Sequence, residues 1–452
     1  MNRIARRAGV LLLLALLLIG GIVLFVVEFS AKAGSWVVFP GSPHVYNGGN
    51  IGCGTVVDRE GVILLELNDQ RAYSKSDALR KSTVHWLGDR SGSVDAQALA
   101  SHSHELVGFD LLNGIYSYGE SGSVATLTLS AQAQMAALEA LGNYRGTVAV
   151  YNYKTGQILC AVTTPAFDPD NAPVFDEENP PEEYKDLYWN KFTQFHYVPG
   201  SIFKVVTLAA VVEAKPEILE KTFTCKGSYV LEPDKITCEI PHGEQNVKTA
   251  FKNSCNCAFA QIVLELGGDT LQECVEQFQV TESVNFDGIT TAKGNFLSTD
   301  VAQVSAAWAG IGQYNDEINP CAFLTFMGSI ANGGQGVEPY IVKEISGTYH
   351  AKTQKRDRIM SEDTAKLLTE YLRNNVENKY GDGNFPGMTV CAKTGTAEVG
   401  GGKKPNAMLA GFVTDEATPW AFIVCVEDAG YGGQVCLPIA SKVLAACKEH
   451  VG

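Results

Sequence analysis

The chain has 452 residues and a formal net charge of −15 at pH 7, with 45% hydrophobic and 19% charged residues. A chain of this length is expected to form about two to four domains, and the apolar content is sufficient for large cores. The excess of acidic residues argues against nucleic acid, and against an anionic surface, as the binding partner. We therefore expect a globular protein with a different class of ligand.

The first thirty residues form a segment of their own. Arg3, Arg6 and Arg7 precede an uncharged apolar run from Ala8 to Val27. About 20 apolar residues can cross a membrane, whereas the apolar region of a cleaved signal peptide is typically about 7–15 residues long. Arginines on the short N-terminal side favour a single-pass anchor in the cell membrane, with the rest of the chain outside the cytoplasm. The cleavage-like sequence Ala31-Lys32-Ala33 leaves a secreted product as the alternative.

Residues 31–125 are predicted to form a small β-containing module, here called the pedestal. They contain short apolar segments such as Thr55–Val57 and Val62–Leu67 and carry no chemical signature. The pattern changes at Thr126, where longer periodic segments begin. The predicted domains are therefore an anchor at 1–30, the pedestal at 31–125 and a third domain at 126–452.

The third domain has β-structure at both ends and a mostly helical middle. A helix is predicted at Ala131–Leu141, followed by a hairpin of Gly146–Tyr153 and Gln157–Thr163. Helices in the middle include Asn256–Leu266 and Pro320–Ala331. The end of the chain is predicted to form three strands and a closing helix, at Thr389–Glu398, Ala407–Thr414, Trp420–Glu427 and Val435–Glu449. An early hairpin and three late strands suggest one sheet assembled from both ends of the domain.

The segment from Tyr197 to Ala210 carries the strongest chemical signal. Pro199-Gly200 precedes an apolar run, which predicts a helix that begins at or beside Ser201. Lys204 lies on the same face of its first turn. The helix N-terminus favours a developing anion at Ser201, and burial would lower the pKa of Lys204 toward that of a useful base. This is the minimal pair for nucleophilic acyl transfer; the alternative is a helix-capping serine followed by a solvated lysine.

Two further motifs complete a candidate site. Ser254-Cys255-Asn256 opens a predicted helix and offers a hydroxyl and an amide. Lys393-Thr394-Gly395-Thr396 lies on a predicted strand and offers a cation and two hydroxyls, while its glycine permits close approach of another backbone. Each motif has a second copy, Ser283-Val284-Asn285 in a loop and Lys154-Thr155-Gly156 at a hairpin turn. The order of the motifs along the chain and their predicted structural context select the copies at Ser254 and Lys393.

The twelve cysteines give no dense disulfide framework. Cys225 and Cys238 flank a strand-turn-strand pattern and either bridge it or remain free. Cys255-x-Cys257, with His242 nearby, lacks the four-ligand spacing of structural zinc. We therefore expect no metal, and no motif indicates a cofactor.

The order Ser-x-x-Lys, Ser-x-Asn, Lys-Thr-Gly resembles that of the penicillin-recognising serine acyltransferases. The resemblance is closest to class B penicillin-binding proteins, the monofunctional transpeptidases of bacterial cell-wall synthesis, and covers about residues 125–450. Pro165-Ala166-Phe167-Asp168-Pro169 and Ala331-Asn332-Gly333-Gly334 also resemble that family. The family implies an α/β (α+β) fold, with a five-stranded antiparallel sheet covered by helices and an all-helical subdomain.

The resemblance implies a role for each motif residue. The implied catalytic residues are Ser201, Lys204, Ser254 and Asn256, and the implied substrate-binding residues are Lys393, Thr394, Gly395 and Thr396. Ser201 would attack a D-alanyl-D-alanine stem peptide after giving its proton to Lys204, and Ser254 would relay a proton to the leaving D-alanine. The N–H groups of Ser201 and Thr396 would form the oxyanion hole.

These expectations define a membrane-anchored D,D-transpeptidase that β-lactam antibiotics acylate. Its expected partners are peptidoglycan stem peptides and other cell-wall synthesis proteins, not nucleic acid. The alternative within the same fold is a D,D-carboxypeptidase or β-lactamase-like hydrolase, which would transfer the acyl group to water. A penicillin-binding signal receptor would need several membrane spans, and a scaffold with a silent site would not need the intact motifs.

Overall fold

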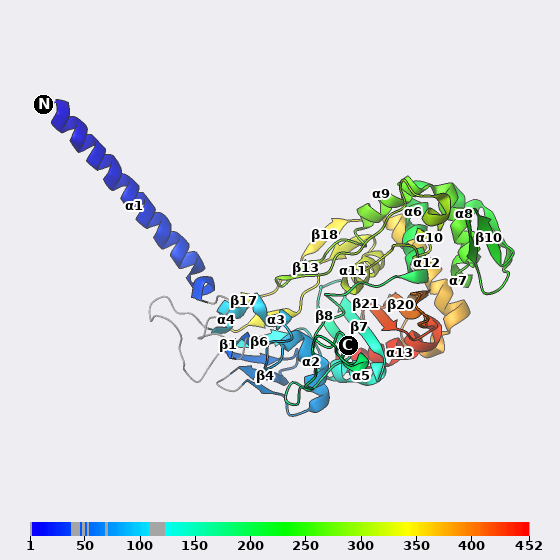
Figure 1. The fold of residues 1–452 in the computed structure, drawn as a ribbon, viewed down its shortest axis with the longest axis horizontal. Helices are drawn as coiled ribbons and strands as arrows, with labels where there is room; N and C mark the ends of the chain where they lie inside the picture. The colour runs from blue at the N-terminus through cyan, green and yellow to red at the C-terminus, as the bar shows by residue number, and fades with distance from the viewer. Residues whose placement is uncertain are drawn as a thin grey trace.

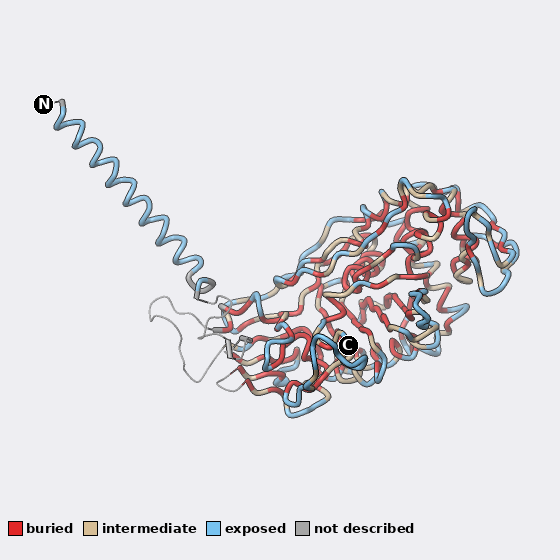
Figure 2. Tube along the Cα trace, viewed as in Figure 1, coloured by how far each residue is buried: buried red, intermediate tan, exposed pale blue. Residues whose placement is uncertain are grey.

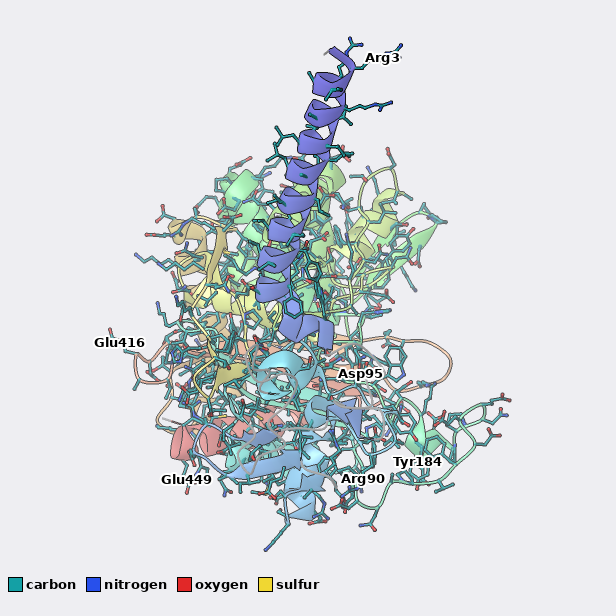
Figure 3. All side chains as sticks on the ribbon, turned by 90° about the vertical axis from the view of Figure 1, so that its left-hand side faces the viewer. Arg3, Arg90, Asp95, Tyr184, Glu416 and Glu449 are labelled. Carbon is teal, nitrogen blue, oxygen red and sulfur yellow. The ribbon has the colours of Figure 1, made fainter. Side chains whose placement is uncertain are left out.

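The computed structural model describes residues 2–37, 46–47, 50–51, 54–67, 71–107 and 123–451. Helix α1 (Asn2–Val37) extends away from the rest of the molecule, and its apolar run is exposed (Figures 1 and 2). Arg3 lies at its free end (Figure 3). Within the described ranges, α1 is the one helix long and apolar enough to cross a membrane, as the sequence predicts.

The part of the body nearest α1 contains a six-stranded sheet with the order β17-β16-β6-β3-β4-β5. β3 and β6 are parallel, and the other neighbours are antiparallel. The strands are β3 (Gly54–Val57), β4 (Ile63–Leu67), β5 (Ala72–Tyr73), β6 (Val124–Leu127), β16 (Val342–Ile345) and β17 (Tyr349–His350). Short strands β1 (Tyr46–Asn47) and β2 (Asn50–Ile51) pair separately, and α2 (Asp77–Leu87), α3 (Gln97–Ala100) and α4 (Ser103–Val107) follow β5. This sheet draws strands from both sides of residue 125, so the domain limits stay a prediction.

The predicted five-stranded antiparallel sheet is present, with the order β19-β20-β21-β7-β8. Its strands are β7 (Arg145–Asn152), β8 (Ile158–Thr164), β19 (Val390–Ala397), β20 (Asn406–Val413) and β21 (Trp420–Glu427). The early hairpin therefore pairs with the last of the three late strands. The sheet is thus assembled from both ends of the predicted domain.

Helices cover both faces of this sheet (Figure 1). Alternate residues of each strand enter different cores: Val148 and Val150 pack with α5 (Ala131–Leu141) and α13 (Gly432–His450), whereas Ala149 and Tyr151 face α11 (Pro320–Ala331). Gly328 lets α11 approach closely, because a Cβ there would lie 1.9 Å from the Tyr151 hydroxyl. The predicted bounds of α5 and α11 match the structure.

The region farthest from α1 is mainly helical (Figure 1). It contains α6 (Lys204–Ala214), α7 (Val247–Asn253), α8 (Asn256–Leu266), α9 (Gly268–Phe278), α10 (Gln303–Ala309) and α12 (Glu362–Asn375). It also contains two small antiparallel pairs, which the predicted all-helical subdomain did not include: β9 (Thr222–Cys225) with β12 (Gly243–Asn246), and β10 (Ser228–Leu231) with β11 (Asp234–Thr237). The strand-turn-strand pattern that the sequence shows around Cys225 and Cys238 accounts for part of them.

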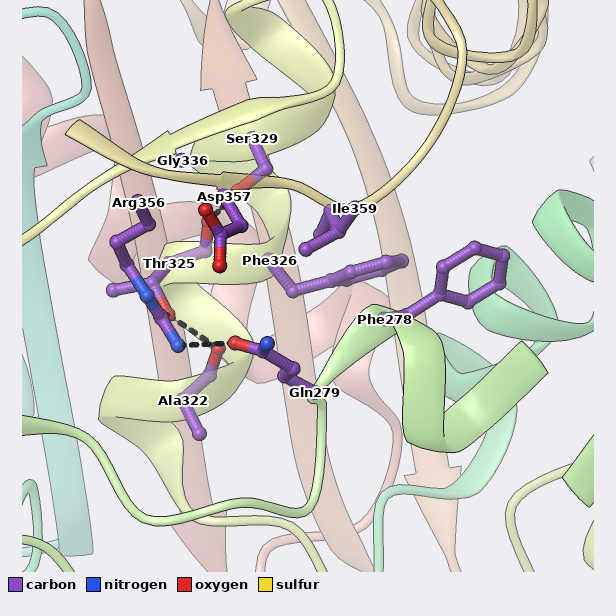
Figure 4. A pocket seen from close by; sticks show the side chains of 10 residues that line it. All are labelled: Phe278, Gln279, Ala322, Thr325, Phe326, Ser329, Gly336, Arg356, Asp357 and Ile359. Carbon is purple, nitrogen blue, oxygen red and sulfur yellow. Dashed lines mark hydrogen bonds between the residues drawn. The ribbon is translucent and has the colours of Figure 1, made fainter. Parts of the chain in front are cut away.

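A side-chain network joins Gln279, the residue after α9, to α11 and β18 (Lys355–Arg358). β18 pairs with β15 (Gln335–Val337). Arg356 donates to the Thr325 hydroxyl at 3.2 Å and to Gln279 Oε1 at 2.7 Å (Figure 4). These side chains line a small pocket whose other residues include Phe278 and Phe326. The pocket is lined by none of the predicted site residues and lies where these elements pack together.

Candidate active site

Ser201 lies in a 3₁₀ turn, Gly200–Phe203, that leads directly into α6. Gly200 has φ of +54°, and its N–H donates to Gly312 O at 2.8 Å. A Cβ on Gly200 would lie 2.5 Å from Thr396 O, so only glycine lets this turn pack against β19. The prediction that a helix begins beside Ser201 is confirmed. The turn places the serine next to the strand that carries the Lys-Thr-Gly motif.

Lys204 is fully buried one turn after Ser201. Its Nζ lies 2.9 Å from Ser201 Oγ, 2.9 Å from Ser254 O and 2.6 Å from Asn256 Oδ1. Burial lowers the pKa of Lys204 to about 7, because the charged amine loses its hydration. A substantial fraction of this amine is therefore neutral near neutral pH.

The hydrogen bonds of Lys204 define where its lone pair lies in the neutral form. A neutral amine has two N–H groups and one lone pair, and the carbonyl oxygen of Ser254 and the amide oxygen of Asn256 can only accept. The Asn256 amide is oriented by its own Nδ2, which donates to Thr237 O at 2.9 Å. Both N–H groups of Lys204 are thus engaged, and the lone pair is left for the proton of the Ser201 hydroxyl.

Ser254 lies between α7 and α8 in a left-handed conformation, with φ of +57°. Such a conformation is uncommon for a residue other than glycine and is found where the surroundings impose it. The Ser254 hydroxyl lies 2.9 Å from Lys393 Nζ and 3.4 Å from Lys204 Nζ. The structure therefore brings the second motif between the first and the third.

Lys393 is fully buried in β19, where its Nζ also donates to Thr394 O at 2.8 Å. Burial, together with the charge of Lys204, lowers the pKa of Lys393 well below its usual range. A bound carboxylate would have the opposite effect and favour the charged amine. Thr394 and Thr396 are partly exposed on the same strand. A Cβ on Gly395 would lie 3.0 Å from Ile202 Cγ2, so this glycine fits the close packing of β19 against the serine turn.

Residues 146–445 match the family model of the penicillin-binding protein transpeptidase domain. The chain belongs to this family. It is 27% identical to the peptidoglycan D,D-transpeptidase PbpA of Mycobacterium tuberculosis over 360 residues, which cover 73% of each chain. It is also 27% identical to stage V sporulation protein D of Bacillus subtilis over 329 residues, 68% of this chain and 50% of that protein.

The structure of this penicillin-binding protein is similar to that of penicillin-binding protein A from Mycobacterium tuberculosis, solved as a ceftriaxone acyl-enzyme complex. The TM-score is 0.75 at 23% identity, covering 88% of this chain and 98% of that chain. The predicted class B resemblance and the predicted fold class are thereby confirmed. The roles of the individual site residues remain predictions.

The structure brings together the copies of the short motifs that the sequence analysis selected, around Ser201, Ser254 and Lys393, while their roles stay a prediction. Lys154 is exposed at the turn between β7 and β8, where it donates to Asn332 Oδ1 at 2.7 Å. Tyr380 was missed. Its hydroxyl accepts from Thr394 N at 3.1 Å and lies 3.0 Å from Thr394 Oγ1, so it holds the strand that carries the third motif.

The penicillin-binding protein also has a cluster of cysteine and histidine side chains that the sequence analysis did not bring together; the expectation of no metal stays a prediction. The side chains of Cys225, Cys238, His242 and Cys255 meet beside Ser254, and their potential ligand atoms all lie within 4.8 Å of one another. Cys225 and Cys238 are both free thiols in the structure, so the disulfide considered for them is not formed there.

Proposed function

We propose that the protein is a peptidoglycan D,D-transpeptidase that forms an acyl-enzyme on Ser201. The observation that carries this proposal is the contact of the Ser201 hydroxyl with a buried amine whose two N–H groups are engaged elsewhere. A serine needs a base that can accept its proton, and Lys204 has a pKa suited to that task near neutral pH. The family match and the named transpeptidase relatives agree with this function.

In the acylation step, Ser201 Oγ attacks the carbonyl carbon between the two terminal D-alanines of a stem peptide. The hydroxyl proton passes to Lys204 Nζ, and a bond forms between Oγ and the carbonyl carbon. The N–H groups of Ser201 and Thr396 would stabilise the oxyanion, as preorganised donors do in comparable enzymes. When the tetrahedral intermediate collapses, the C–N bond breaks, and the proton on Lys204 passes through the Ser254 hydroxyl to the amine of the leaving D-alanine.

In the transfer step, the amine of a neighbouring stem peptide attacks the acyl-enzyme. The new amide bond forms, the ester bond to Ser201 breaks, and the proton of the amine returns to Ser201 Oγ through Lys204. Lys393, Thr394 and Thr396 would bind the terminal carboxylate of the donor peptide, because an amine and two hydroxyls lie along one strand beside Ser254 and the bound carboxylate would favour the charged form of the amine. Gly395 permits the close packing described above. β-Lactams, which carry a carboxylate and a reactive amide, would acylate Ser201 in the same way.

A hydrolase on the same fold is the rival function. In class A β-lactamases a glutamate activates the water that deacylates the enzyme. Among the hydrogen bonds recorded for the described residues, the partners of Lys204 and Lys393 are hydroxyls, carbonyls and an amide, and none is a carboxylate. These contacts differ from the glutamate arrangement of a class A β-lactamase, and the products of the assay below separate a transpeptidase from a carboxypeptidase.

The decisive assay supplies the full-length protein in detergent with a stem-peptide donor and an amine acceptor, and separates the products by mass. The proposal predicts a cross-linked product and an equivalent amount of free D-alanine. Release of D-alanine without cross-linked product would instead identify a carboxypeptidase. Ser201→Ala should give neither product.

We propose further that α1 anchors the protein in the cell membrane by a single span, with the catalytic region on the outer side. The support is the exposed apolar helix with Arg3 at its free end. Cell-wall synthesis proteins are the proposed partners; a Helicobacter pylori PBP2, which this chain resembles with a TM-score of 0.63, was solved as a complex with MreC. Intact cells treated with protease should lose the C-terminal region. A full-length chain protected from external protease, or a soluble cleaved form, would contradict this topology.

A further inference from the structure

The carboxylate of Glu427, at the end of β21, accepts hydrogen bonds from three side chains. Its Oε1 accepts from the Lys191 amine and, at 3.1 Å, from the Tyr197 hydroxyl. Its Oε2 lies 3.4 Å from Arg145 Nε. Lys191 is fully buried and Tyr197 almost fully. Burial alone would raise the pKa of Glu427, but the charges of Lys191 and Arg145 hold this pKa below its usual range. The carboxylate is therefore ionised at neutral pH.

Tyr197 connects this carboxylate to the serine turn. It lies four residues before Ser201 in the chain. Its N–H donates to Ile318 O, and its carbonyl accepts from the N–H of Ile318, both at 2.9 Å. Pro199, whose ring fixes its φ, lies between Tyr197 and Ser201 and leaves this segment little freedom. A shift of the Tyr197 side chain would therefore be passed on to Ser201.

The segment that follows Glu427 connects the same carboxylate to β19. Residues 427–432 run from the end of β21 to the start of α13. The N–H of Gly432 lies 3.5 Å from Thr396 Oγ1. A Cβ on Gly432 would lie 2.3 Å from Gly395 O, so this segment packs directly against the strand. The position of Glu427 is thus tied to that of Thr396.

We propose that Lys191 and Glu427 form a buried ion pair that positions the oxyanion hole, by holding the serine turn in place relative to Thr396. This inference rests on the proposed acyl transfer, in which the N–H groups of Ser201 and Thr396 would stabilise the oxyanion. These two groups belong to different segments, and such donors are effective only when both are aimed at one point. Lys191 and Glu427 are positioning residues, because they act through Tyr197 and residues 427–432.

The alternative is an ion pair that serves only the stability of the fold. A buried ion pair is weak evidence for stability, because the lost hydration offsets the attraction, and an apolar pair of similar volume often serves as well. Here the bonds also have direction. Glu427 Oε1 is shared between an ammonium group and the Tyr197 hydroxyl, and Lys191 Nζ lies 5.1 Å from the centre of the Phe195 ring. An apolar pair would fill the same volume without holding the Tyr197 hydroxyl.

The first test measures acylation by a fluorescent penicillin, with the full-length protein in detergent. Tyr197→Phe removes one hydroxyl and keeps the ring, and Lys191→Met removes the cation and keeps most of the volume. The limiting rate of acylation should fall about 3–10-fold in the first variant and about 10–100-fold in the second, because misplaced oxyanion donors are costly. The dissociation constant of the noncovalent complex should change by less than about twofold. A loss confined to noncovalent binding would overturn the proposal.

Arg80→Met is the matched control for a broken ion pair. Arg80, on α2, forms a bidentate ion pair with Asp168, and the two side chains are 12% and 10% exposed. This variant should lower the melting temperature, because it leaves a largely buried carboxylate without its partner. Its limiting rate of acylation should stay within about twofold of that of the unmodified protein. An equal loss of rate in Arg80→Met and Lys191→Met would show that general destabilisation is the cause.

A double variant separates position from stability. Lys191→Met alone leaves Glu427 without its main partner and should lower the melting temperature. Combining it with Glu427→Leu removes both charges and should restore much of the melting temperature. The proposal predicts that the limiting rate of acylation stays low in the double variant, because the Tyr197 hydroxyl has lost its acceptor. Recovery of both the melting temperature and the rate would identify a purely structural ion pair.

The last test does not depend on acyl transfer. Hydrogen exchange, read by mass spectrometry on peptides that cover residues 197–203, reports the backbone bonds of Tyr197 and Gly200. These amides should exchange at least about tenfold faster in Tyr197→Phe and Lys191→Met, and at an unchanged rate in Arg80→Met. Equal exchange in all variants would overturn the positioning role, whether or not penicillin acylates the protein. The expected exchange in a protein that penicillin fails to acylate would contradict the proposed function alone.

Discussion

The side-chain amine of Lys393 lies 2.9 Å from the hydroxyl oxygen of Ser254. The same hydroxyl lies 3.4 Å from the amine of Lys204, so it stands between two buried lysines. Two adjacent buried amines resist being charged together, and burial and this repulsion lower the pKa of Lys393. Ser254 is therefore placed to carry a proton between the base beside Ser201 and the strand that would hold the substrate carboxylate.

The rate at which penicillin acylates Ser201 should depend on pH. Only the neutral form of Lys204 can accept the Ser201 proton, and burial lowers its pKa to about 7. The second-order rate of penicillin acylation should therefore rise about tenfold per pH unit below this pKa and level off above it. The measurement is the rate of labelling between about pH 5 and 9. A rate that is flat across this range, or that falls as the pH rises through 7, would exclude a neutral lysine as the base.

Asn256→Asp should move this profile to higher pH. A carboxylate at the position of Asn256 Oδ1, 2.6 Å from Lys204 Nζ, would favour the charged amine and raise its pKa by about 1–3 units. The midpoint of the acylation profile should rise accordingly. Asn253→Asp is the matched control, because Asn253 is the last residue of α7, three residues before Asn256, but its side chain donates to Gln245 instead. Equal midpoints in both variants would show that Asn256 does not act on Lys204.

Lys393 and Lys154 belong to the two copies of Lys-Thr-Gly and should behave differently. Lys393→Ala removes a buried amine beside Ser254, and by analogy with loss of one preorganised donor it should cost about 2–4 kcal/mol of transition-state stabilisation. Lys154→Ala alters an exposed turn and should cost less than about 0.5 kcal/mol. Acylation rates of the two variants decide the matter. Equal losses, or a larger loss at Lys154, would mean that the wrong copy has been assigned.

The five-stranded sheet and the serine turn could be predicted because their signals are local. Alternating apolar residues define β7, β8 and the last three strands, and Pro199-Gly200 followed by an apolar run defines the turn at Ser201. The early hairpin (β7 and β8) and the three late strands lie at opposite ends of one predicted domain. We therefore expected them to join in one sheet. These features needed no knowledge of contacts between distant segments.

Features that depend on distant contacts were not predictable. β16 and β17 are short and join a sheet whose other strands lie before residue 128, so no local pattern places them there. Tyr380 ends a π-helical turn, and only the packing of that turn against β19 shows its bond to Thr394. The cysteine cluster comes together only when β9 pairs with β12. Its members are spread from Cys225 to Cys255 and do not show the usual short spacings of zinc ligands.

Mass spectrometry of the penicillin-treated full-length protein identifies the nucleophile, because it locates the acylated residue. We expect a single acyl group on the peptide that contains Ser201. Ser201→Ala should lose all labelling yet stay folded, because the Ser201 hydroxyl bonds with the Lys204 amine and replacing a serine at a helix start costs only about 0.5–2 kcal/mol. Lys204→Ala should also fail to label, because the hydroxyl then has no base. An acyl group on Ser254 or Ser283, or labelling that persists in Ser201→Ala, would contradict the account.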